Sequence, residues 1–279
     1  MIELPIIGSI LEASGTIIEK KILRKKNINF KNYTVFEFLA IFIIMLPIIY
    51  FFWQVKPEAL FPKNILLFAF IITTATIANL LIFYSLKREK VTEFEPLWLM
   101  QPLFTIILAF ILFGSERNWT TFSLALIASG TLVVSHVKKN HLILDKYIIA
   151  ALLGSLAFAI ELVASKPLLS FYSPFTFYFI RCTFILLTTF AIFRPSFKAI
   201  NKNSGIMIFA VGIIWVLYRA IIYYGYESIG IVYTTLLFIL SPVLMILFAV
   251  IFLKEKPSWR QIISTIIILV CVIAAVLLK

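Results

Sequence analysis

Charged side chains interrupt several long apolar stretches of the sequence, and they are the strongest candidates for chemistry. Arg181 and Arg219 each carry a planar guanidinium that can bind a carboxylate or phosphate through two parallel hydrogen bonds. Glu161 could pair with either arginine while the site is empty. Because charges inside apolar segments are costly and mark transport pathways, we expect a carboxylate or phosphate of the substrate to compete with Glu161 for an arginine. The competing interpretations are a permanent ion pair that fixes helix packing and, for Arg181, extension to the membrane surface from a helix end.

Further ionisable residues could take part in coupling or binding. Glu12 lies near the middle of the first apolar stretch, where it could bind and release a proton or hydrogen-bond to a neighbouring helix. Glu161 is a candidate for the same proton coupling. Lys166, at the end of its stretch, could attract an anionic solute at a cavity mouth or extend its amine to the membrane surface. Glu19, beside Lys20, is interpreted as part of a solvated helix end.

Two prolines in corresponding positions predict helix breaks. Pro102 and Pro242 each lack a backbone N–H, so the carbonyl about one turn earlier loses its partner and the helix can bend. We interpret both as candidate pivots for gating, with a static kink as the alternative. Polar and aromatic side chains on these and neighbouring stretches are candidates for lining a substrate cavity, although core packing explains the aromatic ones more simply. They are Asn79, Trp98, Gln101, Trp215, Tyr218, Tyr223, Tyr224 and Ser241.

The elements that would hold these residues are membrane-spanning helices. Of the 279 residues, 62% are hydrophobic and 14% are charged, and the mean hydropathy is +1.05, more apolar than a water-soluble domain. A helix needs about 20 apolar residues to cross the hydrocarbon core. The sequence contains ten such stretches and therefore predicts an all-α membrane protein of about ten transmembrane helices. The stretches are approximately 4–23, 33–53, 64–86, 92–113, 119–137, 147–168, 173–193, 205–226, 231–253 and 259–278.

An internal repeat divides the ten stretches into two halves. The segment EPLWLMQPLFTIILAFILFGSERNW in the fourth stretch parallels TLLFILSPVLMILFAVIFLKEKPSW in the ninth, which aligns Pro102 with Pro242. Because five is an odd number of helices, the second copy must enter the membrane from the opposite side, and the basic residues do swap between equivalent loops. We therefore predict two inverted five-helix repeats, residues 1–139 and 140–279, within one membrane domain.

The formal charge of +12 is a signal of topology in this chain. The basic residues cluster at helix ends and not on an aromatic-studded face, so we do not expect nucleic-acid binding. The positive-inside rule assigns the first, third, fifth, seventh and ninth loops to the cytoplasm. Both termini would then lie on the side of the membrane opposite the cytoplasm. We expect this membrane to be the plasma membrane.

Two segments resemble the drug/metabolite transporter superfamily, and specifically its ten-helix EamA-type members. They are LMQPLFTIILAFILFGSER and ILSPVLMILFAVIFLKEK, each a mid-helix proline followed by an apolar run and a glutamate beside a basic residue. The resemblance spans nearly the whole chain as two copies. It implies an exporter or exchanger of amino acids or other small metabolites, with relatives that carry sugar phosphates or nucleotide sugars. It also implies cytoplasmic termini, opposite to the orientation that the charge count predicts.

Together these features predict a secondary transporter that exports a small metabolite, such as an amino acid, by alternating access through a central cavity. The alternatives are an anion exchanger for sugar phosphates or nucleotide sugars and, in another class, a non-transporting membrane assembly factor. The expected partners are a small-molecule substrate, membrane lipid and a proton or counter-substrate. The sequence contains no catalytic cluster, phosphate-binding loop or metal-ligand spacing, so we expect no enzymatic activity, cofactor or metal. Cys182 and Cys271 lie inside apolar stretches and are expected to be buried thiols.

Overall fold

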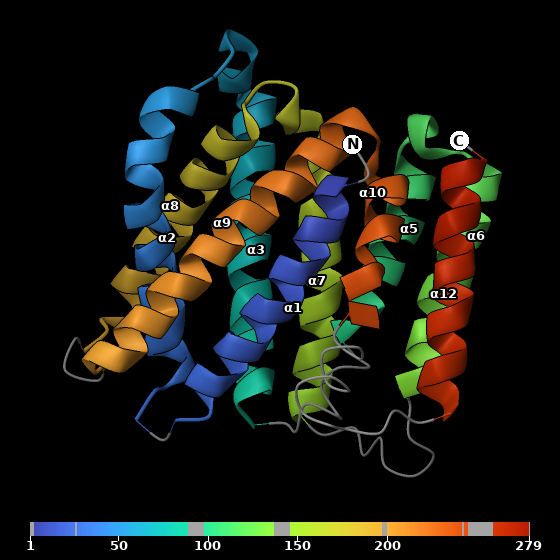
Figure 1. Ribbon diagram of the computed structural model, residues 1–279. Coiled ribbons are helices and arrows are strands. Elements are labelled where there is room, and N and C mark those ends of the chain that lie inside the picture. The colour runs from blue at the N-terminus through green and yellow to red at the C-terminus, as the bar shows by residue number, and fades with distance from the viewer. Residues whose placement is uncertain are drawn as a thin grey trace.

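The computed structural model describes residues 3–25, 27–88, 98–136, 146–196, 200–241, 243–244 and 259–278. Nearly all of these residues are helical (Figure 1), which confirms the predicted all-α class. The α-helices are α1 (Glu3–Leu23), α2 (Phe30–Phe52), α3 (Pro62–Arg88), α5 (Met100–Leu112), α6 (Trp119–His136), α7 (Lys146–Leu169), α8 (Pro174–Phe193), α9 (Lys202–Ser228), α10 (Ile231–Phe238) and α12 (Trp259–Leu277). Two short 3-10 helices, η1 (Pro57–Leu60) and η2 (Gly114–Glu116), lie between them.

The lengths and surfaces of the helices fit a lipid environment. Within the described residues, five helices are each long and apolar enough to cross a membrane, namely α2, α3, α7, α8 and α9. Helix α5 and residues 262–277 of α12 are shorter apolar helices. Large side chains such as Tyr50, Leu66 and Trp259 are exposed on the outside of the bundle, where a soluble protein would present mainly polar groups. The chain is therefore an integral membrane protein.

The bundle consists of two five-helix repeats that run in opposite directions. Helices α1, α2, α3, α5 and α6 form the first repeat, and α7, α8, α9, α10 and α12 form the second. Figure 1 shows α1 running down the bundle and its counterpart α7 running up it. The packing is symmetric as well, because α3 packs against α7 as α9 packs against α1, and α2, α5 and α6 pack against their counterparts α8, α10 and α12. The predicted inverted architecture is confirmed, whereas the predicted boundary between residues 139 and 140 lies outside the described residues.

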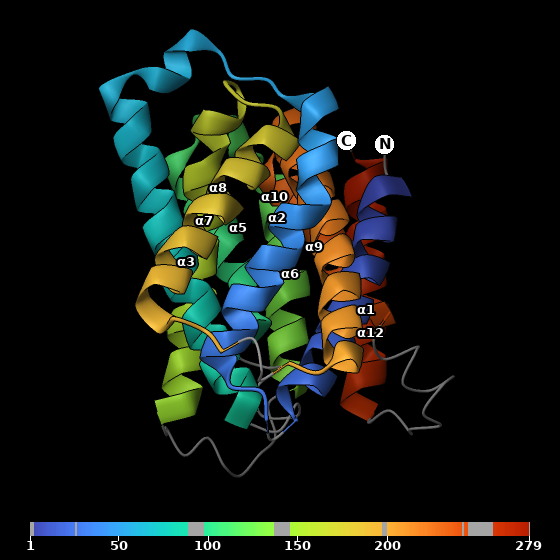
Figure 2. The same cartoon turned by 90° about the vertical axis from the view of Figure 1, so that its left-hand side faces the viewer.

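The two ends of the bundle differ in charge. We call the end where α1 finishes and α2 begins the basic end, and the opposite end, where both chain termini lie, the far end (Figures 1 and 2). The basic residues described at the basic end are Lys20, Lys21, Arg24, Lys25, Lys31, Lys87, Arg88, Lys146, Arg194, Lys202 and Arg260. Those described at the far end are Lys56, Lys63, Arg117 and Lys166. The fold thus gathers the basic residues of both repeats at one end.

Side-chain caps mark where two helices of the second repeat begin. The Ser173 hydroxyl accepts a hydrogen bond of 3.1 Å from the backbone N–H of Thr176, and Pro174 follows at the first position of α8. The side chain of Asn201 caps α9 in the same way, accepting a bond of 2.9 Å from the N–H of Ser204. These caps fix the starts of the two helices that carry the candidate arginines.

Backbone contacts between the repeats close part of the far end. The N–H of Lys56 donates to the carbonyl of Phe171 at 2.8 Å, and the Ser173 hydroxyl donates to the carbonyl of Phe52 at 2.6 Å. These bonds join the connection after α2, in the first repeat, to the connection between α7 and α8, in the second.

Glu116 makes a further contact between the repeats at the far end. Its carboxylate accepts hydrogen bonds from the backbone N–H groups of Ile231, at 2.9 Å, and Val232, at 3.0 Å, and it also pairs with Lys166. An anion is stabilised at a helix N-terminus because unpaired N–H groups converge there. Gly230 precedes α10 with a φ of +90°, and a Cβ at this position would lie 2.9 Å from a Glu116 oxygen. Position 230 therefore requires glycine on both grounds.

Both repeats contain a helix break at corresponding positions. At Leu99 and at Ile239 the ψ angle is −11°, whereas an α-helix has a ψ of about −42°. Leu99 lies about one turn before Pro102. Because proline has no backbone N–H, a carbonyl in this turn lacks its helical hydrogen bond, which weakens the helix there. Ile239 lies at the equivalent place before Pro242, which is outside the described residues.

Candidate functional site

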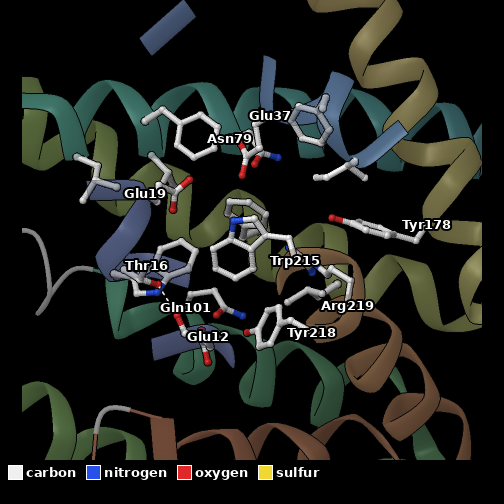
Figure 3. A pocket seen from close by; sticks show the side chains of 18 of the residues that line it. Glu12, Thr16, Glu19, Glu37, Asn79, Gln101, Tyr178, Trp215, Tyr218 and Arg219 are labelled. Carbon is white, nitrogen blue, oxygen red and sulfur yellow. Dashed lines mark hydrogen bonds between the residues drawn. The ribbon is translucent and has the colours of Figure 1, made fainter. Parts of the chain in front are cut away.

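A central cavity lies between the two repeats (Figure 3). It contains about 770 Å³ of space, counting the part open to solvent. Its lining extends from Tyr178, near the far-end start of α8, to Leu86, near the basic end of α3, so the cavity crosses the middle of the bundle and reaches toward the basic end. The polar residues that line it are Glu12, Thr16, Glu19, Glu37, Asn79, Gln101, Arg181 and Arg219. Aromatic surface comes from Phe38, Phe83, Trp98, Phe158, Tyr178, Trp215 and Tyr218.

A second cavity, of about 540 Å³ when the part open to solvent is counted, lies beside the first and is lined by α1, α5, α7, α9 and α10. Glu12, Trp98 and Gln101 line both cavities, whereas Pro102 and Ser241 line only the second. The two helix breaks therefore border a cavity. A concave apolar space with a few convergent polar groups is the usual form of a small-molecule site.

Arg181, Arg219 and Glu161 come together in the interior. The Nε atom of Arg181 lies 2.8 Å from Oε1 of Glu161, and Nη1 of Arg219 lies 3.8 Å from Oε2. The Tyr223 hydroxyl donates a hydrogen bond of 3.2 Å to the same carboxylate. Arg181 and Glu161 are almost completely buried, so Arg181 does not extend to the membrane surface.

The two guanidiniums share the one carboxylate unequally. Arg181 lies closer to the carboxylate than Arg219 does, although Nε and Nη2 of Arg181 and Nη1 of Arg219 all lack a hydrogen-bond partner among the described residues. The ring of Phe158 lies 5.4 Å from the Arg219 guanidinium and supports it by a cation–π contact. Both arginines line the central cavity, and both have N–H groups without a hydrogen-bond partner among the described residues, which a bound anion could use.

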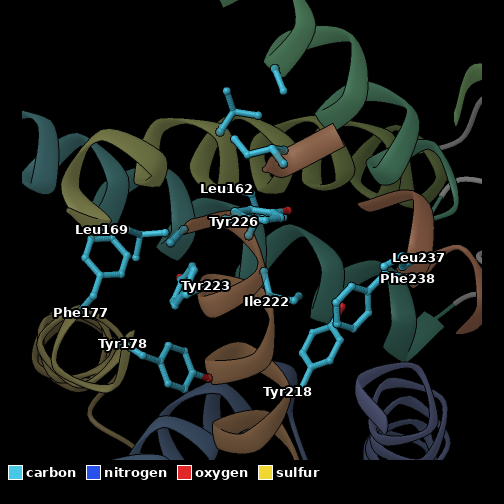
Figure 4. Close-up of a cluster of buried hydrophobic side chains, with 14 of the residues drawn as sticks. Leu162, Leu169, Phe177, Tyr178, Tyr218, Ile222, Tyr223, Tyr226, Leu237 and Phe238 are labelled. Atoms are coloured by element: carbon cyan, nitrogen blue, oxygen red, sulfur yellow. The ribbon is translucent and has the colours of Figure 1, made fainter. Parts of the chain in front are cut away.

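Aromatic residues form the core around these charges (Figure 4). Tyr223 packs edge-on against Phe177, with ring centroids 5.1 Å apart, and against Tyr178 at 6.2 Å. Tyr218 packs in the same manner against Phe238 at 5.5 Å. This packing of α8, α9 and α10 restricts the movement of the side chains that hold the charged groups.

Glu12 lies where the two cavities meet. It is buried on α1, and its carboxyl faces the hydroxyls of Tyr218 and Ser241. Because it lines both cavities, this side chain is accessible from either of them.

Glu19 and Glu37 form an acidic pair that the sequence-based prediction did not include in the site. Glu19 is 5% exposed and accepts a hydrogen bond of 3.1 Å from Tyr33, so its interpretation as a solvated helix end is wrong. Glu37 is 3% exposed, and its Oε2 atom has no hydrogen-bond partner among the described residues. Its carboxyl faces the indole of Trp215. Figure 3 shows both carboxyls on the cavity side of their helices.

Asn79 and Gln101 present amides to the central cavity. The Asn79 amino group donates to the carbonyl of Ala75 at 2.7 Å, and that of Gln101 donates to the Thr105 hydroxyl at 2.9 Å. With the amino groups engaged, the side-chain carbonyl oxygens are the parts that can accept a bond from a ligand.

Four of the described candidate residues line neither cavity, and one of them is Glu161, which is completely buried and pairs with the two arginines. Lys166 is at the far end, paired with Glu116. Tyr224 is 47% exposed on the outer side of α9. Tyr223 is completely buried and reaches the site only through its bond to Glu161.

Two inverted helical repeats with a cavity between them form an architecture that recurs among membrane transporters. The sequence pattern of the EamA-like transporter family matches residues 2–136 and, a second time, residues 145–277. The chain therefore belongs to the EamA-like transporter family. Family membership implies that the protein lies in a lipid membrane and transports a small molecule across it.

Solved structures share the fold at low sequence identity. Of the 29 solved chains that match, one described as "Crystal structure of protein" is 16% identical and superposes with a TM-score of 0.74. The match covers 99% of this chain and 97% of the other. No curated protein matches the sequence.

Proposed function

We propose that the protein is a secondary transporter that exports a small polar metabolite of the amino-acid type by alternating access through the central cavity. The observation that carries the proposal is the sharing of Glu161 by two buried guanidiniums. A substrate carboxylate can bind Arg219 through parallel hydrogen bonds and still leave Arg181 paired with Glu161 at 2.8 Å. No buried charge then loses its partner during binding and release.

Contacts at the far end and the two helix breaks support alternating access. Hydrogen bonds between the repeats, including those from α10 to Glu116, hold the far end together, while the central cavity reaches from the middle of the bundle toward the basic end. In the state in which the cavity opens at the far end, these contacts would separate, and α5 and α10 would bend at Leu99 and Ile239. Pro102 and Pro242, next to these breaks, are the gating residues in this proposal.

Glu12 is the residue that we propose for proton coupling. It lines both cavities, so a proton taken up from one cavity can be released to the other when the helices rearrange. Glu161 is completely buried and paired with both guanidiniums. Its role in the proposal is therefore to hold Arg181 and Arg219 in position.

We also propose that the basic end faces the cytoplasm, because short cytoplasmic loops carry the excess of lysine and arginine. Both termini are then outside the cell. In this orientation the central cavity reaches toward the side from which an exported substrate enters.

Flux through purified protein in liposomes tests the proposal. A labelled amino-acid mixture is expected to enter liposomes by saturable counterflow. Arg219→Gln is expected to lower the rate at least about tenfold, since the charged hydrogen bonds to the substrate carboxylate are lost. The matched control is Arg88→Gln, which changes an exposed arginine at the end of α3. Counterflow that continues unchanged in the Arg219→Gln protein would contradict the proposal.

An anion exchanger for sugar phosphates is the second candidate, because two guanidiniums could hold a phosphate. The carboxyls of Glu12, Glu19 and Glu37 also line the cavity and would repel a dianion, so we favour the amino-acid type. Dependence on solute in the opposite compartment distinguishes the two, since an exchanger stops without a counter-substrate and a proton-coupled exporter responds to a pH gradient. A non-transporting assembly factor would not require a cavity lined by charged groups.

A further inference from the structure

The acidic pair points to a second ligand-binding subsite in the central cavity. Glu19 and Glu37 come from different helices of the first repeat, and their carboxyls are near enough to interact electrostatically. Glu161 has two guanidinium partners, whereas the described contacts of the acidic pair are with neutral groups, the Tyr33 hydroxyl and the Trp215 indole. Two adjacent carboxylates in a poorly solvated site are stabilised when a cation lies between them.

Neither arginine that lines the cavity among the described residues is paired with the acidic pair. Arg181 and Arg219 are the guanidiniums on its wall, and both are paired with Glu161. Figure 3 shows Trp215 between the acidic pair and Arg219, so the two charged regions are separated by an aromatic side chain. The cavity therefore has the acidic pair on one side of Trp215 and Arg219 on the other, where Glu161 and Glu12 lie near enough to interact with that guanidinium.

We propose that the acidic pair binds a protonated amino group of the transported solute while Arg219 binds its carboxylate. An ammonium group has three N–H donors and requires oxygen acceptors. The Oε2 atom of Glu37, which has no partner among the described residues, can accept one of these bonds. The second carboxyl of the pair and the Asn79 carbonyl can accept the others.

Trp215 restricts the class of substrate further. The face of an indole ring attracts an ammonium group, so Trp215 favours a cation on the acidic side. A solute that contacts both regions must have its amine and carboxylate separated by a chain that passes this ring. The substrate class is therefore a zwitterion with its charges at opposite ends, rather than an anion or a simple amine. This inference rests on the proposed function, because it takes Arg219 as the carboxylate site.

Three probes with the same four-carbon chain test the inference on the purified full-length protein. They are 4-aminobutanoate, butanoate and n-butylammonium, and their binding is measured by the stabilisation of the protein against thermal unfolding. The zwitterion is expected to bind at least about tenfold more tightly than either singly charged probe, because it fills both subsites. Butylammonium is expected to stabilise the wild-type protein on its own at higher concentration.

Two variants separate the subsites. Glu37→Gln is expected to weaken binding of 4-aminobutanoate and butylammonium about tenfold and to leave butanoate binding unchanged. Arg219→Gln is expected to have the converse effect, with butanoate binding lost and butylammonium binding retained. The matched control is Glu227→Gln, which changes an exposed glutamate at the C-terminal end of α9. It is expected to leave the binding of all three probes unchanged.

The outcomes distinguish this inference from the proposed function. Butanoate binding that depends on Arg219, without any stabilisation by butylammonium, would overturn the amine subsite and leave the carboxylate site intact. Failure of both carboxylate probes to bind would overturn the proposed function. If Glu37→Gln does not fold, Glu19→Gln is the second variant, and the comparison of the three probes on wild-type protein decides the question without any substitution.

Discussion

Replacing Glu161 with glutamine is expected to destabilise the protein more than replacing Arg181 with methionine. The Glu161→Gln change keeps the size of the side chain and removes one negative charge. It leaves Arg181, which is 1% exposed, and Arg219 without the carboxylate that they share. Removing one partner of a buried ion pair costs about 3–5 kcal/mol, because an uncompensated charge remains in the interior.

Replacing the arginine of the pair leaves fewer charged groups without a partner than replacing the glutamate does. In Arg181→Met, Glu161 keeps the ion pair with Arg219 at 3.8 Å and the hydrogen bond from Tyr223 at 3.2 Å. Its expected cost is therefore smaller, about 1–3 kcal/mol. The double variant removes both charges, so its destabilisation is expected to be clearly less than the sum of the two single effects.

The two free cysteines provide the assay. Cys182 and Cys271 are buried, so a thiol-reactive fluorogenic maleimide should label them only as the protein unfolds. Heating in detergent with this dye then gives an apparent Tm for each variant, and Glu161→Gln is expected to lower it by about 10 °C. Glu227→Gln serves as the exposed control. An effect of Glu161→Gln no larger than that of Arg181→Met, or strict additivity in the double variant, would refute the shared-carboxylate reasoning.

Two other predictions concern packing and orientation. A Cβ at Gly154 would lie 2.8 Å from the Ile82 side chain, so Gly154→Val is expected to push α7 from α3 and to destabilise the protein by about 1–3 kcal/mol. Gly130→Ala, where nothing lies within 4 Å, is the control, and equal Tm values for the two variants would contradict this account of the packing. If the basic end is cytoplasmic, a membrane-impermeant maleimide added to intact cells is expected to label Lys63→Cys at the far end and not Lys21→Cys at the basic end. The opposite labelling pattern would reverse the proposed orientation.

The interior ion pair could be predicted from sequence because its energetics leave few alternatives. Arg219 and Glu161 both interrupt apolar stretches that must cross the membrane, and an isolated charge there would be very costly. The internal repeat of the sequence also predicted that the helices of both residues lie near the centre of the bundle. Whether Arg181 joins them could not be derived, since that depends on how α8 is rotated about its axis.

The acidic pair was missed for two different reasons. Glu37 also interrupts an apolar stretch, so the reasoning used for Glu161 would have identified it if it had been applied to the second helix. Glu19 was judged by its sequence neighbours, Lys20 and Lys21, which suggested a solvated helix end. Successive residues of a helix point about 100° apart, so a carboxyl can face the cavity although basic residues adjoin it in sequence.

Helical geometry also explains the outcome for the adjacent tyrosines. Tyr223 follows Arg219 by four residues and therefore shares its face of α9, which contacts Glu161. Tyr224 is one residue further and points toward the outside of the bundle. Lys166 could not be assigned from sequence, because its partner Glu116 belongs to the other repeat and the two meet only in the folded bundle.

The location of both chain ends at the far end has a practical consequence for protein engineering. The start of a second copy would have to lie on the same side of the membrane as the end of the first. The two could therefore be joined by an ordinary hydrophilic linker, without an added membrane-crossing segment. Such a tandem fusion would carry one intact and one altered copy in a single polypeptide at fixed stoichiometry, so that any influence of one copy on the other could be measured directly.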